Sequence, residues 1–537
     1  MNKQNKFWGT ALLTIILFLF PGVLAIATPK PLFNQAKKPI SNIAQQPATT
    51  EQQTAKELAE KAFAEALQLQ NQETVESLKQ AIAKYQEALQ LFRAAADQHG
   101  EAKTLGSIGI AYSQLDEQQQ AINYLNQSLK LSEAEKNIPN QITSLVRIGL
   151  AYQKLNQLQQ SISYYKQALP LLRTTGEKTK EAHVLGEIAE AYKSLGNFEQ
   201  AIAYYNQAIT LYEAEKDSAN AANTLKALGL IYQSLGNNQS AIAQFQQALS
   251  HWQAINSKSE AASLLKLMGA SDSNLGNYQQ AINYYNQAIS IWQDLGEKNQ
   301  TARTFQFLGQ LYRELGDIDT SLSYQKQALS LWEALNDSAG QAEMLSDIGL
   351  SYYTLDDTKQ AISYYEQARS LWQSLNNQSE EAKILNAISS IYYWSKNYQQ
   401  AQAYLNQSLQ IFQAQKLPIW EAETLVKLAM VYSLLGDKDQ AIIYLNQAIQ
   451  IIETLPNPNF KALEFSRAAN TYYFLKDYEK GLKYYNQALQ LWQGMGNLSN
   501  QASELATIAR IERDRGNFNQ SLTNIEAAIT IIEDLRT

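Results

Sequence analysis

Apolar residues recur along the chain with the spacing of α-helices. Leu105, Ile108 and Tyr112 lie three and four positions apart, so they share one face of a helix. A second run with the same spacing begins at Ala201, just after the pair Gly196-Asn197. Gly or Asn at such a junction tolerates the left-handed conformation that ends a helix. The pattern therefore predicts hairpins of two helices.

The hairpin pattern repeats at a constant offset of 40 in the numbering. A small residue followed by an aliphatic one marks each unit, from Ala81-Ile82 to Ser521-Leu522, with Ala401-Gln402 as a variant. The constant offset gives twelve units without insertion or deletion. Such a period indicates a repeat array. HEAT arrays and WD40 propellers have similar periods, but propeller blades need short alternating strands, which the pattern lacks.

Small residues on the first helix of the units precede a tyrosine by three positions. The small residues are Gly109, Gly149, Ala189, Gly229, Gly269, Gly309 and Gly349, and the following residues are Tyr112, Tyr152, Tyr192, Tyr232, Asp272, Tyr312 and Tyr352. With segments such as GNFEQAIAYYNQAI at 196–209, the chain closely resembles the tetratricopeptide repeat over most of its length. The resemblance implies an all-α, right-handed superhelical α-solenoid of about twelve helical hairpins.

Two features depart from the family pattern. The unit is longer than the usual length of about 34 residues. The additional residues fall around helix junctions such as 335–340, which predicts longer helices. The first unit carries Leu69 and Gln72 where later units carry the small residue and the tyrosine. We therefore expect a capping repeat at 51–98 and eleven repeats at 99–537.

The long unit is similar to bacterial and cyanobacterial arrays that precede CHAT-type, caspase-like domains. In that family the catalytic domain uses a His/Cys pair. The chain contains no Cys, so the resemblance extends to the array alone.

The segment 1–27 has the pattern of a secretory signal peptide. Lys3 and Lys6 precede an apolar run at 7–20, and Ala25-Ile26-Ala27 forms a cleavage motif. An uncleaved anchor is the alternative, because 7–27 is about long enough to cross a bilayer. Residues 28–50 are polar and contain four prolines, which predicts a flexible linker. We expect a periplasmic or secreted protein after cleavage, or a membrane-anchored protein without cleavage.

Composition excludes several chemistries. The absence of Cys removes disulfides, thiolate metal sites and cysteine nucleophiles, and only three His are present. The net charge of −7 gives no electrostatic basis for binding nucleic acid. We therefore expect no enzyme activity, no cofactor, no metal, and no membrane contact in the mature form.

Aromatic residues fall into columns with the same period. The first column lies late in the second helices: Trp252, Trp292, Trp332, Trp372 and Trp492, with Phe92, Tyr212 and Phe412. The column lies in phase with the Ala and Tyr residues of the apolar stripe of the second helix. This phase favours packing between repeats over a row of contacts to a ligand. The second column is predicted to be half-buried: Tyr124, Tyr164, Tyr204, Tyr284, Tyr324, Tyr364, Tyr404, Tyr444 and Tyr484.

The family resemblance implies that first helices line a concave surface that receives a peptide or a partner helix. Residues on that face change from polar to aromatic and Arg-rich along the chain, and these types are enriched at binding hot spots. The candidate partner-binding residues are Arg303, Arg313, Tyr353, Tyr393, Trp394, Tyr473, Phe474, Arg510 and Arg513. The alternative is a set of scattered surface residues in a Tyr-rich protein.

The last helix, expected at 521–535, remains apolar without a polar capping helix after it. Its apolar residues are Leu522, Ile525, Ile529, Ile531 and Ile532. Repeat arrays normally need a polar cap. Either this end is tolerated, or the helix docks on a partner or on a second copy in self-association.

Together these expectations predict a non-enzymatic scaffold that binds a protein or peptide in its concave groove outside the cytoplasm. A regulatory or sensor array for a separately encoded catalytic partner, such as a CHAT-type protease, is the alternative.

Overall fold

The computed structural model describes residues 49–535, so the predicted leader at 1–27 and nearly all of the predicted linker lie outside the described residues. Twenty-four α-helices and no strands occupy the described part. The helices are α1 (Thr50–Gln70), α2 (Val75–Ala94), α3 (Gln98–Gln114), α4 (Gln118–Ala134), α5 (Ile138–Lys154), α6 (Leu158–Thr175), α7 (Lys178–Ser194), α8 (Phe198–Ala214), α9 (Ser218–Ser234), α10 (Asn238–Ala254), α11 (Lys258–Asn274), α12 (Tyr278–Asp294), α13 (Lys298–Glu314), α14 (Ile318–Ala334), α15 (Ser338–Thr354), α16 (Thr358–Ser374), α17 (Gln378–Trp394), α18 (Tyr398–Ala414), α19 (Pro418–Leu435), α20 (Lys438–Thr454), α21 (Pro458–Phe474), α22 (Tyr478–Gly494), α23 (Leu498–Asp514) and α24 (Phe518–Asp534). Within 49–535, none of these helices has the length and apolarity needed to cross a membrane.

Most helices have the same length as α3 and α4, and short connections of three residues join them, which accounts for the constant period. In the predicted Gly-Asn junctions, the glycine ends one helix and the asparagine is the N-cap residue of the next. Gly196 takes the left-handed conformation with φ of +73°. Asn197 has φ of −88°, and its side chain accepts a hydrogen bond from the backbone N–H of Gln200 as the N-cap of α8. Each junction therefore ends one helix and starts the next within three residues.

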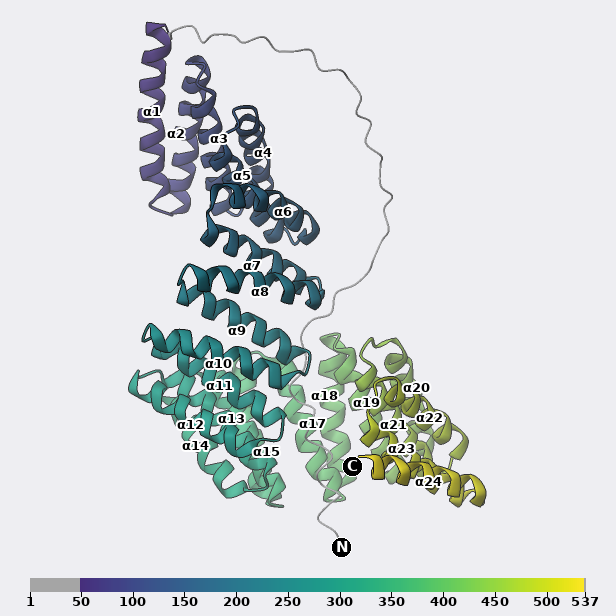
Figure 1. The fold of residues 1–537 in the computed structure, drawn as a ribbon. Helices are drawn as coiled ribbons and strands as arrows, with labels where there is room; N and C mark the ends of the chain where they lie inside the picture. Colours follow the sequence, from purple (N-terminus) through teal and green to yellow (C-terminus); the bar gives the residue numbers. More distant parts are fainter. Residues whose placement is uncertain (1–48, 536–537) are drawn as a thin grey trace, which may run out of the picture.

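The helices stack side by side along a curved path from α1 to α24, which lie at opposite ends of the stack (Figure 1). Odd-numbered helices are the first helices of the hairpins and even-numbered helices are the second. Beyond sequential neighbours, the closest element pairs in the described residues are all first helices: α3–α5, α11–α13, α13–α15 and α19–α21. In a curved stack the inner side is the more crowded one, so the first helices form the inner, concave surface. The architecture is an all-α solenoid.

The tryptophan column lies inside the stack, as the packing interpretation predicted. Trp332 is 1% exposed, and the other members of the column are also buried. Trp332 approaches Gly340 of α15 so closely that a Cβ there would lie 2.5 Å from the indole ring. The column therefore joins each second helix to the next first helix, and it offers no ladder to a ligand.

The second tyrosine column is half-buried in most units, again as predicted. Its members stack on the tyrosines of the first helices. Tyr112 and Tyr124 have ring centroids 5.4 Å apart with planes at 13°. Tyr152–Tyr164 and Tyr352–Tyr364 repeat this geometry. These pairs lock the two helices of one hairpin together.

Substitution of glycine by alanine is expected to change stability in opposite directions at two glycines inside helices. A Cβ at Gly229 in α9 would lie 2.4 Å from Cε1 of the buried Phe245, whereas a Cβ at Gly186 in α7 would meet nothing within 4 Å. We expect Gly229→Ala to destabilise its hairpin, because overpacking costs about 1–3 kcal/mol. Gly186→Ala should stabilise by roughly 1 kcal/mol through helix propensity.

Hydrogen exchange of α7–α10 in both variants measures the two effects. Equal protection in both variants would contradict the close approach at Gly229.

Candidate binding surface

Each first helix presents residues three or four positions apart to the inner surface. In α13 these residues are Arg303, Phe307, Gln310 and Glu314, all exposed or half-exposed. The equivalent positions in the other first helices follow at the constant offset of the units. The inner surface can therefore be read helix by helix along the stack.

The two predicted arginines of α13 lie in different environments. Arg303 is exposed, and its guanidinium lies 5.4 Å from the ring centroid of Trp332. The Arg313 side chain is only 15% exposed and pairs with Asp347 of α15 at 3.7 Å. Burial raises the pKa of Asp347, and Arg313 opposes that shift. Arg303 is thus available to a partner, whereas Arg313 mainly joins two repeats.

The predicted tyrosines lie at the C-terminal ends of first helices, where they are half-buried. Tyr353 follows this pattern in α15. The Tyr393 ring contacts Trp394 edge-on at 5.2 Å, and Tyr473 contacts Phe474 in a similar way at 5.7 Å. The tyrosines therefore support the neighbouring Trp and Phe side chains, which are the more exposed of each pair.

Trp394, Leu434 and Phe474 occupy the same position in α17, α19 and α21, and we call them the apolar row. Trp394 is 60% exposed, and the other two are exposed as well. The sequence analysis identified both aromatics but missed Leu434, although its offset of 40 from each was a sufficient signal. Three consecutive first helices thus place apolar side chains along one edge of the inner surface.

The two predicted arginines of α23 lie next to the aromatic residues at the end of α21. Arg510 lies 4.9 Å from the Tyr473 ring centroid, and the Tyr473 hydroxyl donates to Asp514 at 2.7 Å. Arg513 pairs with Asp514 at 2.9 Å. Hydrogen bonds from Tyr473 and Arg513 lower the pKa of Asp514. The structure therefore brings Tyr473, Phe474, Arg510 and Arg513 into one region, at a distance along the chain from Arg303 and Arg313.

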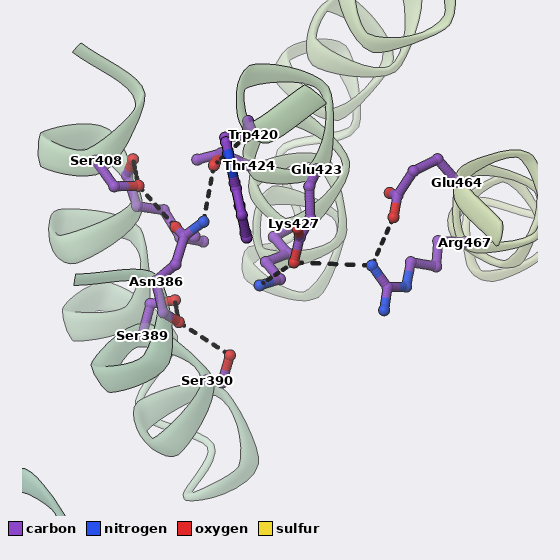
Figure 2. Close-up of polar contacts among 11 residues, drawn as sticks. Asn386, Ser389, Ser390, Ser408, Trp420, Glu423, Thr424, Lys427, Glu464 and Arg467 are labelled. Atoms are coloured by element: carbon purple, nitrogen blue, oxygen red, sulfur yellow. Dashed lines mark hydrogen bonds and ion pairs between the residues drawn. The ribbon is translucent and has the colours of Figure 1, made fainter. Parts of the chain in front are cut away.

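Four charged side chains of α19 and α21 form what we call the charged floor: Glu423, Lys427, Glu464 and Arg467 (Figure 2). Glu423 Oε1 lies 2.7 Å from Lys427 Nζ and 3.8 Å from Arg467 Nη1. Arg467 Nη1 also donates to Glu464 Oε1 at 2.6 Å. The pair between Glu423 and Arg467 crosses from α19 to α21, and the other two pairs lie within one helix each, so the charged floor links two adjacent first helices.

The two acids of the charged floor have opposite pKa shifts. Burial raises the pKa of Glu464 to about 7, with Glu423 adding to the shift and Arg467 opposing it. Burial also acts on Glu423, but Lys427 and Arg467 outweigh it and lower that pKa. Sequence reasoning missed these residues, because a charged helix position usually indicates solvent.

A buried amide joins the adjacent repeats beside the charged floor. Asn386 Nδ2 of α17 donates to Thr424 Oγ1 of α19 at 2.9 Å, and Ser408 Oγ of α18 donates to Asn386 Oδ1 at 2.7 Å (Figure 2). A satisfied buried network of this kind rigidifies its surroundings. The network therefore fixes α17, α18 and α19 relative to one another.

The described residues contain no group of three or more His, Asp or Glu side chains suited to a metal ion. Two of the ion pairs on the inner surface, Arg313–Asp347 and Glu423–Arg467, cross from one repeat to the next. The arrangement is suited to binding, with an exposed apolar edge beside a rigid charged floor. This fold and surface define the class of helical-repeat proteins that bind other proteins.

Comparison with protein-family models then gives the family. Tetratricopeptide repeat models match residues 73–134, 140–214, 180–254, 259–334, 308–374, 380–454 and 466–491. These segments span well over half of the 537 residues, so the chain belongs to the tetratricopeptide repeat family. No curated protein matches the chain.

Solved structures with similar folds share little sequence with this chain. One is a signal transduction ATPase with numerous domains from Pyrococcus horikoshii, which carries a tetratricopeptide repeat sensor. It is 16% identical with a TM-score of 0.45, over 75% of this chain and 65% of that one. Aspartyl phosphate phosphatase F from Bacillus subtilis is 15% identical with a TM-score of 0.40, over 69% and 97%. The apo form of RapI is 16% identical with a TM-score of 0.40, over 51% and 98%.

Proposed function

We propose that the protein is a non-enzymatic scaffold that binds a peptide or a segment of a partner protein along the inner surface of α17–α23. The apolar row carries this proposal. Exposed Trp and Phe side chains, fixed by the tyrosines beneath them, lose little conformational entropy when a partner covers them. The rest of the inner surface supplies polar contacts around this apolar edge.

The repeat geometry favours an extended peptide as the bound segment. First helices in direct contact have axes on the order of 10 Å apart. Three residues of an extended peptide in the polyproline II conformation span about 9 Å and complete one turn, so every third side chain faces the same side. A peptide running along the apolar row would therefore meet Trp394, Leu434 and Phe474 with apolar side chains at about every third residue.

Selection of binders from a random peptide library, followed by affinity measurement on purified variants, tests the proposal. We expect selected peptides to carry apolar residues with this spacing. Trp394→Ala and Phe474→Ala should each weaken binding by about tenfold or more, as hot-spot truncations do. Tyr278→Ala is the matched control, because Tyr278 is an exposed aromatic at the start of a second helix.

Equal affinity of the selected peptides for all three variants would exclude the apolar row as the binding site. It would leave the family membership intact.

We also propose that the scaffold works outside the cytoplasm, in the periplasm or after secretion. The basic, apolar and small-residue pattern of 1–27 supports this location. The mass of the chain recovered from cells that express it with its own leader tests the proposal, since cleavage after Ala27 removes the whole leader. Recovery of the chain at its full mass would contradict cleavage.

A further inference from the structure

The outer face of α24 is apolar and exposed. Five side chains on it are between 37 and 68% exposed, and we call them the C-terminal stripe: Phe518, Leu522, Ile525, Ile529 and Ile532. Large apolar patches on a soluble protein usually mark an interaction site. The stripe is therefore the strongest unexplained feature outside the inner surface.

Other second helices show what normally covers these positions. Ile282, Tyr285 and Ile289 of α12 are the counterparts of Leu522, Ile525 and Ile529, six units earlier. They are buried in a cluster that includes Phe305 and Leu308 of α13. The C-terminal stripe is thus a surface shaped to receive a helix.

The opposite end of the stack does not offer a matching surface. The exposed large apolar residues of α1 are limited to Leu58 and Leu67, among exposed residues such as Lys56, Glu60 and Lys61. Head-to-tail stacking of α24 on α1 would remove these charges from water, and among the three only Lys56 has an ion-pair partner in the described residues, so the desolvation cost would be large. A two-fold interface, in which one patch meets its own copy, avoids that cost.

The spacing and charge of α24 favour pairing with itself. The residues of the C-terminal stripe alternate by four and three positions, which is the seam of a two-stranded coiled coil. The charged residues of α24 are all acidic: Glu526, Glu533 and Asp534. A parallel pair would place like charges side by side. An antiparallel pair moves Glu533 and Asp534 next to the positive N-terminal end of the partner helix.

We propose that two copies of the chain associate through an antiparallel, two-fold pairing of their α24 helices. The stripe is centred on Ile525, so this residue meets its own copy. Leu522 then lies opposite Ile529, and Phe518 lies opposite Ile532. The helix is already ordered on α23, so pairing costs little conformational entropy, and the short seam gives an affinity on the order of micromolar.

Analytical ultracentrifugation of the full chain, expressed with its own leader, is the first test. We expect a reversible dimer at high micromolar concentration. Ile525→Asp should weaken dimerisation by at least about tenfold, because it places two carboxylates at the centre of the seam. Thr523→Asp is the matched control, since Thr523 is exposed on α24 away from the stripe. Circular dichroism checks that both variants keep their helices.

Single cysteines then distinguish the possible pairings, because the chain has no Cys of its own. Under mild oxidation, Ile525→Cys alone should form a covalent dimer. Leu522→Cys should link to Ile529→Cys in a mixture of the two variants, but not to itself.

A covalent dimer of Leu522→Cys alone would show a parallel pair and overturn the antiparallel proposal. Dimerisation that is lost on Leu58→Asp in α1 would indicate head-to-tail stacking instead. A chain that stays monomeric at high micromolar concentration would exclude self-association.

Discussion

Trp332→Ala is expected to destabilise the middle of the solenoid by about 3–5 kcal/mol, the range for removing a buried large aromatic side chain. The Trp332 side chain is 1% exposed and lies against Gly340 of the next first helix. Its indole nitrogen has no hydrogen-bond partner among the described residues, so truncation removes packing and the contact of the ring with the Arg303 guanidinium. The surrounding helices can close the cavity only in part, because each is held by a neighbour on both sides.

Hydrogen exchange is the appropriate measurement, because long repeat arrays do not unfold in one step. Protection should fall in α13–α16 and remain unchanged in distant helices such as α2–α5. Trp394→Ala is the matched control and should change stability by less than about 0.5 kcal/mol, since Trp394 is exposed. A similar loss of protection in both variants would contradict the assignment of one tryptophan to the core and the other to the surface.

The period of the sequence was enough to predict this contrast. Trp332 has aromatic counterparts at the same position of many other second helices, whereas no other first helix has a tryptophan at the position of Trp394. A side chain type that recurs from unit to unit is selected by the contacts that the units share. The hairpins, the buried column and the half-buried tyrosine column follow from that rule and could be predicted, whereas the stacking of those tyrosines on the first helices was not predicted.

Contacts between one particular pair of repeats could not be predicted in the same way. Arg313 was expected to face a partner, but its pairing with Asp347 depends on which side chain the next helix places beside it. Leu434 drew no attention by itself, because single exposed leucines are common. Leu434 becomes informative only when it is compared with Trp394 and Phe474, which lie 40 residues before and after it.

The buried acids were the least predictable feature. Glu464 and Glu504 occupy the position at which α13 and α19 carry Thr304 and Thr424. Threonine satisfies its hydroxyl within its own helix, as Thr304 does with the carbonyl of Gln300. A carboxylate at that depth cannot do so, and its ionisation becomes costly. This difference leads to a strong expected dependence of stability on pH.

Glu504→Gln is expected to stabilise the C-terminal repeats above neutral pH. Glu504 is buried, one of its oxygens accepts a hydrogen bond from Ser466, and the other has no partner among the described residues. Burial raises the pKa of Glu504 from 4.5 to about 7. Between these values the folded chain holds a proton that the unfolded chain releases, so stability falls as pH rises through this window. The difference between the two pKa values corresponds to roughly 3 kcal/mol.

The neutral amide of Gln has no such ionisation, so the variant should lose this part of the pH dependence and gain up to roughly 3 kcal/mol at pH 8 relative to pH 4.5. Hydrogen exchange of α21–α23 at several pH values measures the effect. Glu526→Gln on the exposed face of α24 is the matched control and should follow the wild-type profile. Glu464 is less suitable for the test, because its replacement also breaks the pair with Arg467. An unchanged pH profile in Glu504→Gln would mean that this carboxyl group ionises as freely in the folded chain as in the unfolded one.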